Sequence, residues 1–202
     1  VQNMTVLLQE VTTSISERFG FYHVGVFINE PTSGNTHLQA SNSEGGRRML
    51  ARGHSLKIGA TGIVGYVAGS GKPRIALHTD EDAAFFNNPD LPETRSEMAI
   101  PLRQSEQTIG VLDVQSTTEN AFDDDDLKIL TILADQVSVA LQNARLFEET
   151  QRATTEMQGL LQSYAREQWL SVVKEQKKVG YRYKDNFQAL NESHGVDVGD
   201  SI

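Results

Sequence analysis

RSEMAIPLRQSEQTIGVLDVQS, residues 95–116, is the stretch that decides the fold. Met98, Ile100 and Leu102 alternate with other residues, which is the period of a strand whose successive side chains point to opposite faces. After a short polar turn the alternation resumes over residues 109–115. The pattern predicts two antiparallel strands joined by a tight turn.

The segments before this hairpin predict a helix, further short strands and a second, shorter helix. Met4, Leu8 and Val11 begin a helical face that continues to Ile15. In chain order we expect a helix ending near Gly20 and then strands over 24–28 and 37–41. A polar connection over 42–57 follows, with one helical turn and a short strand around 54–58. After it we expect a short helix over 59–72 with Thr61 as N-cap, a short strand over 73–77 and a long loop over 79–93.

From Asp124 onward the pattern is helical. Apolar residues between Leu127 and Phe147 occupy more than half of the helix circumference, and the pattern continues past Gly159. A helix reaching Lys177 would be ~75 Å long at 1.5 Å per residue, far longer than a compact domain requires. Because one sheet cannot cover so much apolar surface, we expect this helix also to pack on its counterpart in a two-fold, coiled-coil homodimer.

The order of these elements predicts an α+β fold in which helices cover one side of an antiparallel sheet. We expect one domain over residues 1–150, a helical coiled-coil extension over 151–178, and a short hairpin or partly ordered connector over 179–202. The predicted hairpin pairs residues 180–184 with residues 187–190.

Composition excludes several classes of function. The chain has no cysteine, which excludes disulfides, thiolate nucleophiles and thiolate metal sites. Residues 1–150 hold 11 Lys and Arg against 20 Asp and Glu, and residues 151–202 hold 7 against 7, so neither part has the basic field that nucleic acid or anionic lipid requires. No stretch approaches the ~20 apolar residues of a membrane span, so we expect a cytoplasmic protein without membrane contact.

Three segments in this order resemble the GAF domain family of sensory modules. They are GATGIVGYVAGSGKP at residues 59–73, RSEMAIPL at 95–102 and IGVLDVQS at 109–116, the last followed by AFDDDDLKILTILADQVSVALQNARLFEE at 121–149. The resemblance implies a GAF-like (profilin-like) six-stranded antiparallel sheet with helices, followed by a long C-terminal helix. It also implies a ligand pocket between the sheet and the loops around 59–97, dimerisation through the first and last helices, and a covalently linked output domain, such as the histidine kinase of a two-component system, a cyclic-dinucleotide enzyme or a transcriptional activator.

Seven residues are candidates for the ligand site. Tyr66, Phe85, Phe86 and Met98 are expected to line an apolar pocket, Arg74 and Arg95 to pair with an anionic group of the ligand, and His78 to contact the ligand. The alternative is that the same residues form a structural core cluster.

Two charged or glycine-rich motifs have structural explanations. The run ending in GSGK departs from a Walker loop, because Tyr66 and Pro73 stand where glycine and Ser or Thr are required. The four aspartates at 123–126 lack the spacing of a calcium loop and are expected to cap the helix that follows. We therefore predict no metal, no cofactor and no catalytic residue.

The favoured function is a module that senses an unidentified small molecule and transmits the signal through dimerising helices. The alternative is a ligand-free structural module that dimerises and spaces its neighbours. Enzymatic activity is the third class: the methionine sulfoxide reductases and bilin photoreceptors of the GAF family depend on cysteine, which this chain lacks.

Overall fold

The computed structural model describes residues 2–79, 82, 86–175, 178–184 and 186–191. The elements are α1 (Gln2–Phe19), β1 (His23–Glu30), β2 (Asn35–Ser41), α2 (Glu44–Ala51), β3 (Ser55–Lys57), α3 (Gly62–Ser70), β4 (Arg74–Ala76), β5 (Ser96–Gln104), β6 (Gln107–Ser116), α4 (Asp124–Glu175), β7 (Lys178–Lys184) and β8 (Asn186–Asn191). They fall into two compact units, Val1–Glu148 and Glu149–Ile202. None of the helices in the described residues is both long and apolar enough to cross a bilayer.

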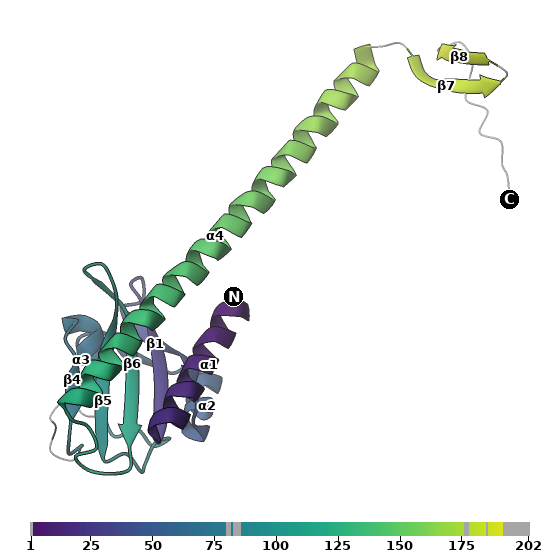
Figure 1. Ribbon diagram of the computed structural model, residues 1–202. Helices are drawn as coiled ribbons and strands as arrows, with labels where there is room; N and C mark the ends of the chain where they lie inside the picture. The colour runs from purple at the N-terminus through teal and green to yellow at the C-terminus, as the bar shows by residue number, and fades with distance from the viewer. Residues whose placement is uncertain (1, 80–81, 83–85, 176–177, 185, 192–202) are drawn as a thin grey trace. The chain divides into compact units, whose positions relative to one another are not determined.

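The first unit is built on a six-stranded sheet in the order β3-β2-β1-β6-β5-β4. Every neighbouring pair is antiparallel, and the hairpin predicted from residues 95–116 is the pair β5 and β6. The predicted six-stranded antiparallel sheet is therefore confirmed. β1 and β6 lie at its centre, so their side chains face packed elements on both sides (Figure 1).

One face of the sheet packs against α1 and α4 (Figure 1). Met98 and Leu112 of the sheet lie in one core cluster with Leu8 of α1 and Leu130 of α4, and all four side chains are buried. The spacing that predicted a helical face on α1 and a strand period in β5 is what brings these residues together.

Helices also cover the other face, contrary to the expectation that they lie on one side only. There α2 and α3 pack on the sheet, with Met49, Ile63 and Val67 against Phe27 and Val111. The physical reason is visible in β5, where all residues from Ser96 to Leu102 are buried. A strand with one solvated face would expose every second residue, so this burial requires cover on both sides.

The helix α2 lies where the sequence predicted a polar connection with a single helical turn. Ser43 is its N-cap and accepts a hydrogen bond from the N–H of Gly46. A side chain at Gly45 would collide with the backbone carbonyl of Asp90, and one at Gly46 would collide with Ser41. The adjacent glycines thus permit close packing within a helix. The prediction of a polar connection was wrong because it took them as the mark of a loop.

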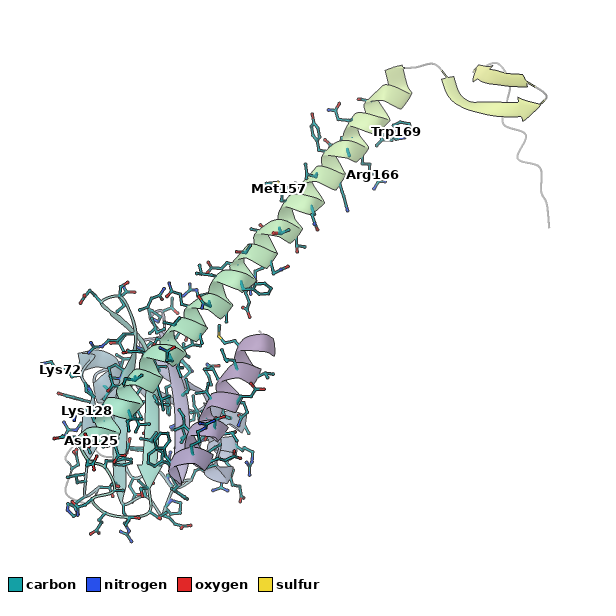
Figure 2. The ribbon with its side chains drawn as sticks, viewed as in Figure 1. Lys72, Asp125, Lys128, Met157, Arg166 and Trp169 are labelled. Atoms are coloured by element: carbon teal, nitrogen blue, oxygen red, sulfur yellow. The ribbon has the colours of Figure 1, made fainter. Side chains whose placement is uncertain are left out.

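The long helix α4 begins with the predicted aspartate cap. Asp123 Oδ1 accepts hydrogen bonds from the N–H groups of Asp125 and Asp126, each at 2.9 Å, and Asp126 accepts one in return from the N–H of Asp123. Lys128 adds an ion pair to Asp125 at 2.7 Å (Figure 2). At 1.5 Å per residue the 52 residues of α4 span ~78 Å, close to the predicted length.

The second unit contains the later turns of α4 and the hairpin of β7 and β8. The predicted pairing of residues 180–184 with 187–190 is confirmed by the register, in which Tyr183 lies opposite Phe187. In the helix, the side chains of Met157 and Trp169 point away from the backbone and are 59% and 68% exposed (Figure 2).

Candidate functional site

Two acidic side chains lie buried next to each other on the sheet face that α2 and α3 cover. Glu97 of β5 is 5% exposed and Asp113 of β6 is 1% exposed. In the β5–β6 register, Glu97 lies opposite Gln115 and Ala99 lies opposite Asp113, so the two carboxyl groups are diagonal neighbours on one face. The alternation that sends Met98 to the opposite face sends Glu97 to this one.

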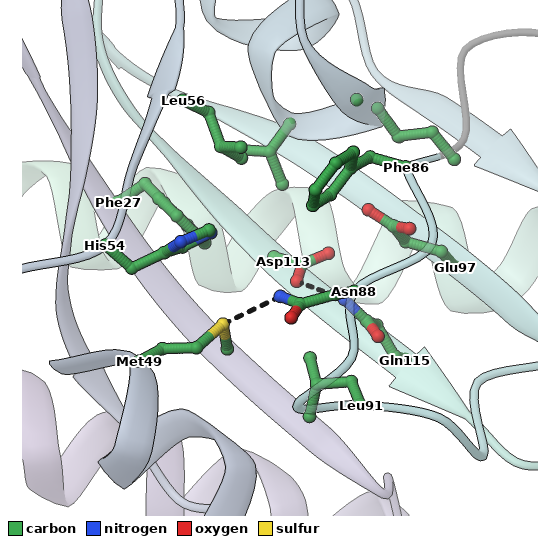
Figure 3. Close-up of a pocket in the computed structure, with 13 residues that line it drawn as sticks. Phe27, Met49, His54, Leu56, Phe86, Asn88, Leu91, Glu97, Asp113 and Gln115 are labelled. Carbon is green, nitrogen blue, oxygen red and sulfur yellow. Dashed lines mark hydrogen bonds between the residues drawn. The ribbon is translucent and has the colours of Figure 1, made fainter. Parts of the chain in front are cut away.

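These side chains line a small cavity of about 30 Å³ (Figure 3). Its lining consists of Phe27, Met49, His54, Leu56, Gly62, Ile63, Val64, Phe86, Asn88, Leu91, Glu97, Asp113 and Gln115. A cavity that holds one water needs about 10 to 15 Å³ of such space, so this one has room for about two waters or one small polar group.

Hydrogen bonds orient one oxygen of Asp113 and leave the other without a permanent donor. Gln115 Nε2 donates to Asp113 Oδ2 at 2.7 Å, and the Thr94 hydroxyl donates to Gln115 Oε1 at 2.6 Å, which fixes the orientation of the amide. The other oxygen, Asp113 Oδ1, is buried and has no hydrogen-bond partner. Gln115 and Glu97 are the two neighbours whose hydrogen bonds to Asp113 oppose the rise that burial causes in its pKa.

His23 of β1 lies beside Asp113 because the intervening residue is glycine. Gly25 is opposite Asp113 in the register, and a Cβ there would lie 3.0 Å from His23 Nε2. His23 Nδ1 is 2.7 Å from Ser43 Oγ, and Nε2 is 3.7 Å from Asp113 Oδ2. Ser41 Oγ lies 3.3 Å from the same Nδ1, so two serine hydroxyls hold this edge of the ring, while the buried Nε2 has no hydrogen-bond partner.

The ionisation of the cluster reflects burial without a compensating cation. Burial raises the pKa of Asp113 to about 7, against the opposing effect of hydrogen bonds from Gln115 and Glu97. Burial, and then the charge of Asp113, raise the pKa of Glu97 well above its usual range. Burial and the nearby His54 lower the pKa of His23 to about 3, so its ring is neutral at pH 7 and its contact with Asp113 is not an ion pair. Burial therefore favours the protonated form of both carboxyl groups, and the ionisation of one depends on that of the other.

The segment of residues 86–91 covers the cavity and is held to α2. Asn88 Nδ2 contacts Met49 Sδ at 2.8 Å (Figure 3), and the N–H of Asp90 donates to Asn88 Oδ1. Arg48 Nε donates to Asp90 Oδ1 at 3.1 Å, and Arg52 pairs with the other carboxylate oxygen. Hydrogen bonds from Arg52 and Arg48 lower the pKa of Asp90, so this attachment is charged at neutral pH.

Of the six predicted site residues that the structure describes, Phe86 is the one in the cavity wall. Phe86 lines the cavity and is 45% exposed, so the wall that it forms extends to the surface. Met98 lies instead on the opposite face of the sheet, fully buried in the core between α1 and α4, because it is one residue out of phase with Glu97. Phe85 lies outside the described residues.

The other predicted residues lie at the surface, outside the cavity wall. The Arg74 guanidinium is 5.0 Å from the centre of the Tyr66 ring and forms three hydrogen bonds with Asp82. That attachment raises the pKa of Arg74 further. His78 Nδ1 is 3.6 Å from Glu119.

Arg95, the last of the predicted residues, is exposed, and its backbone N–H donates to Ser116 O at the end of the β5–β6 pair. The acidic and polar residues that do line the cavity were missed. Their signal was the presence of Glu97, Asp113 and Gln115 at alternate positions of strands that are otherwise apolar.

Comparisons with known proteins identify a family and a fold. A family model described as GAF domain matches residues 1–142. No curated protein matches the chain. Similar solved structures include the free methionine-R-sulfoxide reductase from Neisseria meningitidis with its substrate, which is 22% identical, with 71% of this chain and 80% of that chain covered and a TM-score of 0.63. The type II free methionine-R-sulfoxide reductase from Thermoplasma acidophilum is 19% identical, with 68% of this chain and 91% of that chain covered and a TM-score of 0.59. The GAF domain of a phosphoenolpyruvate-protein phosphotransferase from Coxiella burnetii is 19% identical, with 72% of this chain and 86% of that chain covered and a TM-score of 0.65. At these identities the likeness shows the fold alone.

Proposed function

Because the chain belongs to the GAF domain family, we propose that it is a regulatory module that senses a small molecule, dimerises through its terminal helices and relays the signal to a covalently linked output domain such as a histidine kinase. Members of this family are ligand-binding or regulatory modules. The observation that carries the proposal is the buried polar cluster at the cavity. Burying two carboxyl groups together destabilises a fold, so a structural module has no reason to keep them, whereas a binding site does.

Dimerisation is supported by a stripe of exposed apolar side chains on α4. In the first unit, Ile132, Val139 and Leu146 recur every seven residues, and each is more than half exposed. They lie on the side of the helix opposite Leu130 and Val137, which pack on the sheet. In the second unit the same spacing continues at Ala153 and Leu160, and Met157 and Tyr164 stand at the companion position of the repeat.

This seven-residue repeat favours a parallel, in-register pair of helices. Positions that would flank the seam on one side are Asp135, Glu149 and Glu156, and those on the other side are the uncharged Ala140, Thr154 and Leu161. A parallel pair places acidic positions opposite uncharged ones, whereas an antiparallel pair places acidic positions opposite each other. Asn143 stands within the seam itself, where a pair of asparagines from two parallel chains can hydrogen-bond and fix the register.

Light scattering on a dilution series tests the dimer. We expect the wild type to be a dimer and the Val139→Asp variant to be a monomer with an unchanged fold, because Val139 is 52% exposed and makes no contribution to the buried core. Arg152→Asp is the matched control, since it introduces the same carboxylate at an exposed residue of α4 outside the seam and its flanking positions. A wild type that is monomeric at every concentration would contradict the proposed relay.

The small size of the cavity supports a second candidate, a ligand-free module that dimerises and spaces its neighbours. A thermal-shift screen separates the two, because a ligand at about 100 times its dissociation constant adds ~2.7 kcal/mol to the stability of the folded state. A spacer would show no ligand-dependent shift with any class of compound, while its dimer would persist.

The similarity to reductases supports a third candidate, reduction of free methionine sulfoxide. The two reductases named above share this fold. The chain has no cysteine to supply the thiolate, so we expect no turnover of methionine-R-sulfoxide with a thiol reductant. Consumption of the reductant that depends on this protein and on Asp113 would establish enzymatic activity and replace the sensory proposal.

A further inference from the structure

We propose that the cavity is a receptor for the ammonium group of a small primary amine, bound between Glu97 and Asp113 with Phe86 at the entrance. This inference rests on the proposed sensory function and names the chemical class of its ligand. Its basis is a pair of buried carboxyl groups that line a cavity, one of which presents an oxygen without a permanent donor.

The charged groups around the carboxyl pair do not neutralise it. On β1, burial lowers the pKa of His23 to about 3, so the ring is neutral at pH 7, and its Nε2 lies 3.7 Å from Asp113 Oδ2. On β4, Arg74 lies on the same face but holds Asp82 with three hydrogen bonds. On α2, Arg48 and the neighbouring Arg52 hold Asp90.

No described cation is among the causes that shift the pKa of Glu97 or Asp113, and the nearby Asp82 adds further negative charge at Glu97. The cavity therefore has a negative potential that only a ligand or a shared proton can balance.

The lining selects an ammonium group over other cations and over anions. Two carboxyl groups and the Gln115 amide offer acceptors in several directions, which suits a tetrahedral group with three N–H donors. The described residues contain no group of three metal-ligating side chains, which disfavours a metal ion. Phe27 and Phe86 complete the wall with aromatic rings, whose faces attract cations.

The size of the cavity limits how much of the ligand can enter. About 30 Å³ accommodates one ammonium head group and excludes a bulky substituent. The rest of the ligand must leave past Phe86, the half-exposed part of the wall. The binding partner is thus an unbranched primary amine with a narrow carbon next to the nitrogen.

Binding of an ammonium group favours the ionised form of the carboxyl pair. In the free protein burial favours the protonated form of both carboxyl groups. In the complex both are ionised around the ammonium group, and the displaced proton goes to solvent. Amine affinity should therefore rise as the pH rises from 6 to 8, while the amine itself stays protonated.

The test uses the full chain with methylammonium chloride and ethanolamine hydrochloride as probes. Sodium chloride at equal ionic strength, ethanol and sodium acetate serve as controls for salt, neutral and anionic solutes. We expect both amines to raise the melting temperature and the control solutes to leave it unchanged. Calorimetry in buffers of different protonation enthalpy should show release of roughly one proton for each amine bound at pH 7.

Three conservative variants locate the effect. Glu97→Gln and Asp113→Asn should each weaken amine binding at least about tenfold, because each removes a charge that the ammonium group needs. Glu106→Gln, at the exposed turn between β5 and β6, should bind as the wild type does. Two independent site variants keep the test decisive if one of them fails to fold.

Three results would overturn the proposal. The first is an equal response to amines in the wild type, Glu97→Gln and Asp113→Asn proteins. The second is the absence of any amine response at pH 8 in a folded wild type, which would mean that the pair holds only a proton. The third is binding that appears only in a His23→Asn variant, which would show that His23 carries the balancing charge. A response to acetate or ethanol instead of amines would overturn the ammonium assignment and leave the sensory function standing.

Discussion

At the residue scale, Glu97 and Asp113 act against the stability of the sheet that holds them. Their burial favours the protonated form, so the folded chain binds protons that the unfolded chain releases between about pH 4 and pH 7. Asp113 therefore lowers the free energy of unfolding as the pH rises through this window, and the loss is complete above pH 7. His23 has the opposite sign, because its ring is neutral in the fold and stability is gained as the pH rises from about 3.

The Asp113→Asn variant isolates the carboxyl contribution. We expect it to be more stable than the wild type at pH 8, by a few kcal/mol at about 1.4 kcal/mol per unit of pKa difference, and to lose this advantage toward pH 4. Urea titrations of both proteins across the range measure the difference, which includes the response of His23 and Glu97 to the loss of the Asp113 charge. A difference that does not change with pH would mean that Asp113 is ionised in the fold as it is in the unfolded chain.

Two glycines in helices should respond to alanine in opposite ways. Gly45→Ala places a methyl group against the Asp90 carbonyl and should destabilise the first unit by about 1 to 3 kcal/mol, with a lower melting temperature. Gly159→Ala, in α4 with open space around it, should raise helicity in far-UV circular dichroism, since alanine favours helix by about 0.8 to 1 kcal/mol. Equal effects of the two changes would contradict the tight packing of α2.

At the scale of elements, the attachment of residues 86–91 to α2 controls access to the cavity. Asp90 is the residue that Arg48 and Arg52 both hold, and Phe86 and Leu91 of the same segment form part of the cavity wall. Since these ion pairs are partly exposed, salt should weaken them.

Removing the Asp90 carboxylate should loosen this segment. We expect Asp90→Ala to speed hydrogen exchange at the Leu91 N–H, which donates to Asn88 O at 2.9 Å, and to make exchange insensitive to salt. Asp125→Ala, which breaks a more exposed ion pair at the start of α4, should leave Leu91 unchanged. Equal protection of Leu91 in wild type and Asp90→Ala would show that packing alone holds the segment.

The strands and the long helix were predictable because their signals are local. The period of two in residues 98–102 and the aspartates before α4 each specify structure without reference to the rest of the chain. The helix α2 could not be predicted in this way. Gly45 and Gly46 must lack side chains because Asp90 and Ser41 pack against them, and these two neighbours lie outside the helix. The site was missed for a related reason: which face of β5 holds a cavity depends on what covers it, so Met98 was chosen where Glu97 lies.

At the scale of the whole molecule, the repeat along α4 predicts how two copies associate. Its seam contains Gln136, Asn143 and Thr150 among apolar residues, so the pair of helices should be of moderate stability and defined register. A pair that is only moderately stable can be shifted by the modest free energy that ligand binding supplies.

Replacing Asn143 tests register and orientation together. We expect Asn143→Leu to tighten the dimer and to admit other alignments, because a buried polar pair costs stability and specifies register. A parallel pair places residue 146 next to its own copy, so the Leu146→Cys variant should form a disulfide between the two chains. The yield of this disulfide should be lower when Leu146→Cys is combined with Asn143→Leu. Failure of the Leu146→Cys protein to cross-link would exclude the parallel arrangement.

Side chains on the two faces of β6 contact different parts of the protein. Asp113 and Gln115 face the cavity, while Leu112 and Val114 pack in the core that α4 shares. Under the proposed sensory function, the odd-numbered positions would serve recognition and the even-numbered ones the contact with α4. Substitutions in the odd set would then change which compound is detected without altering the packing of the long helix.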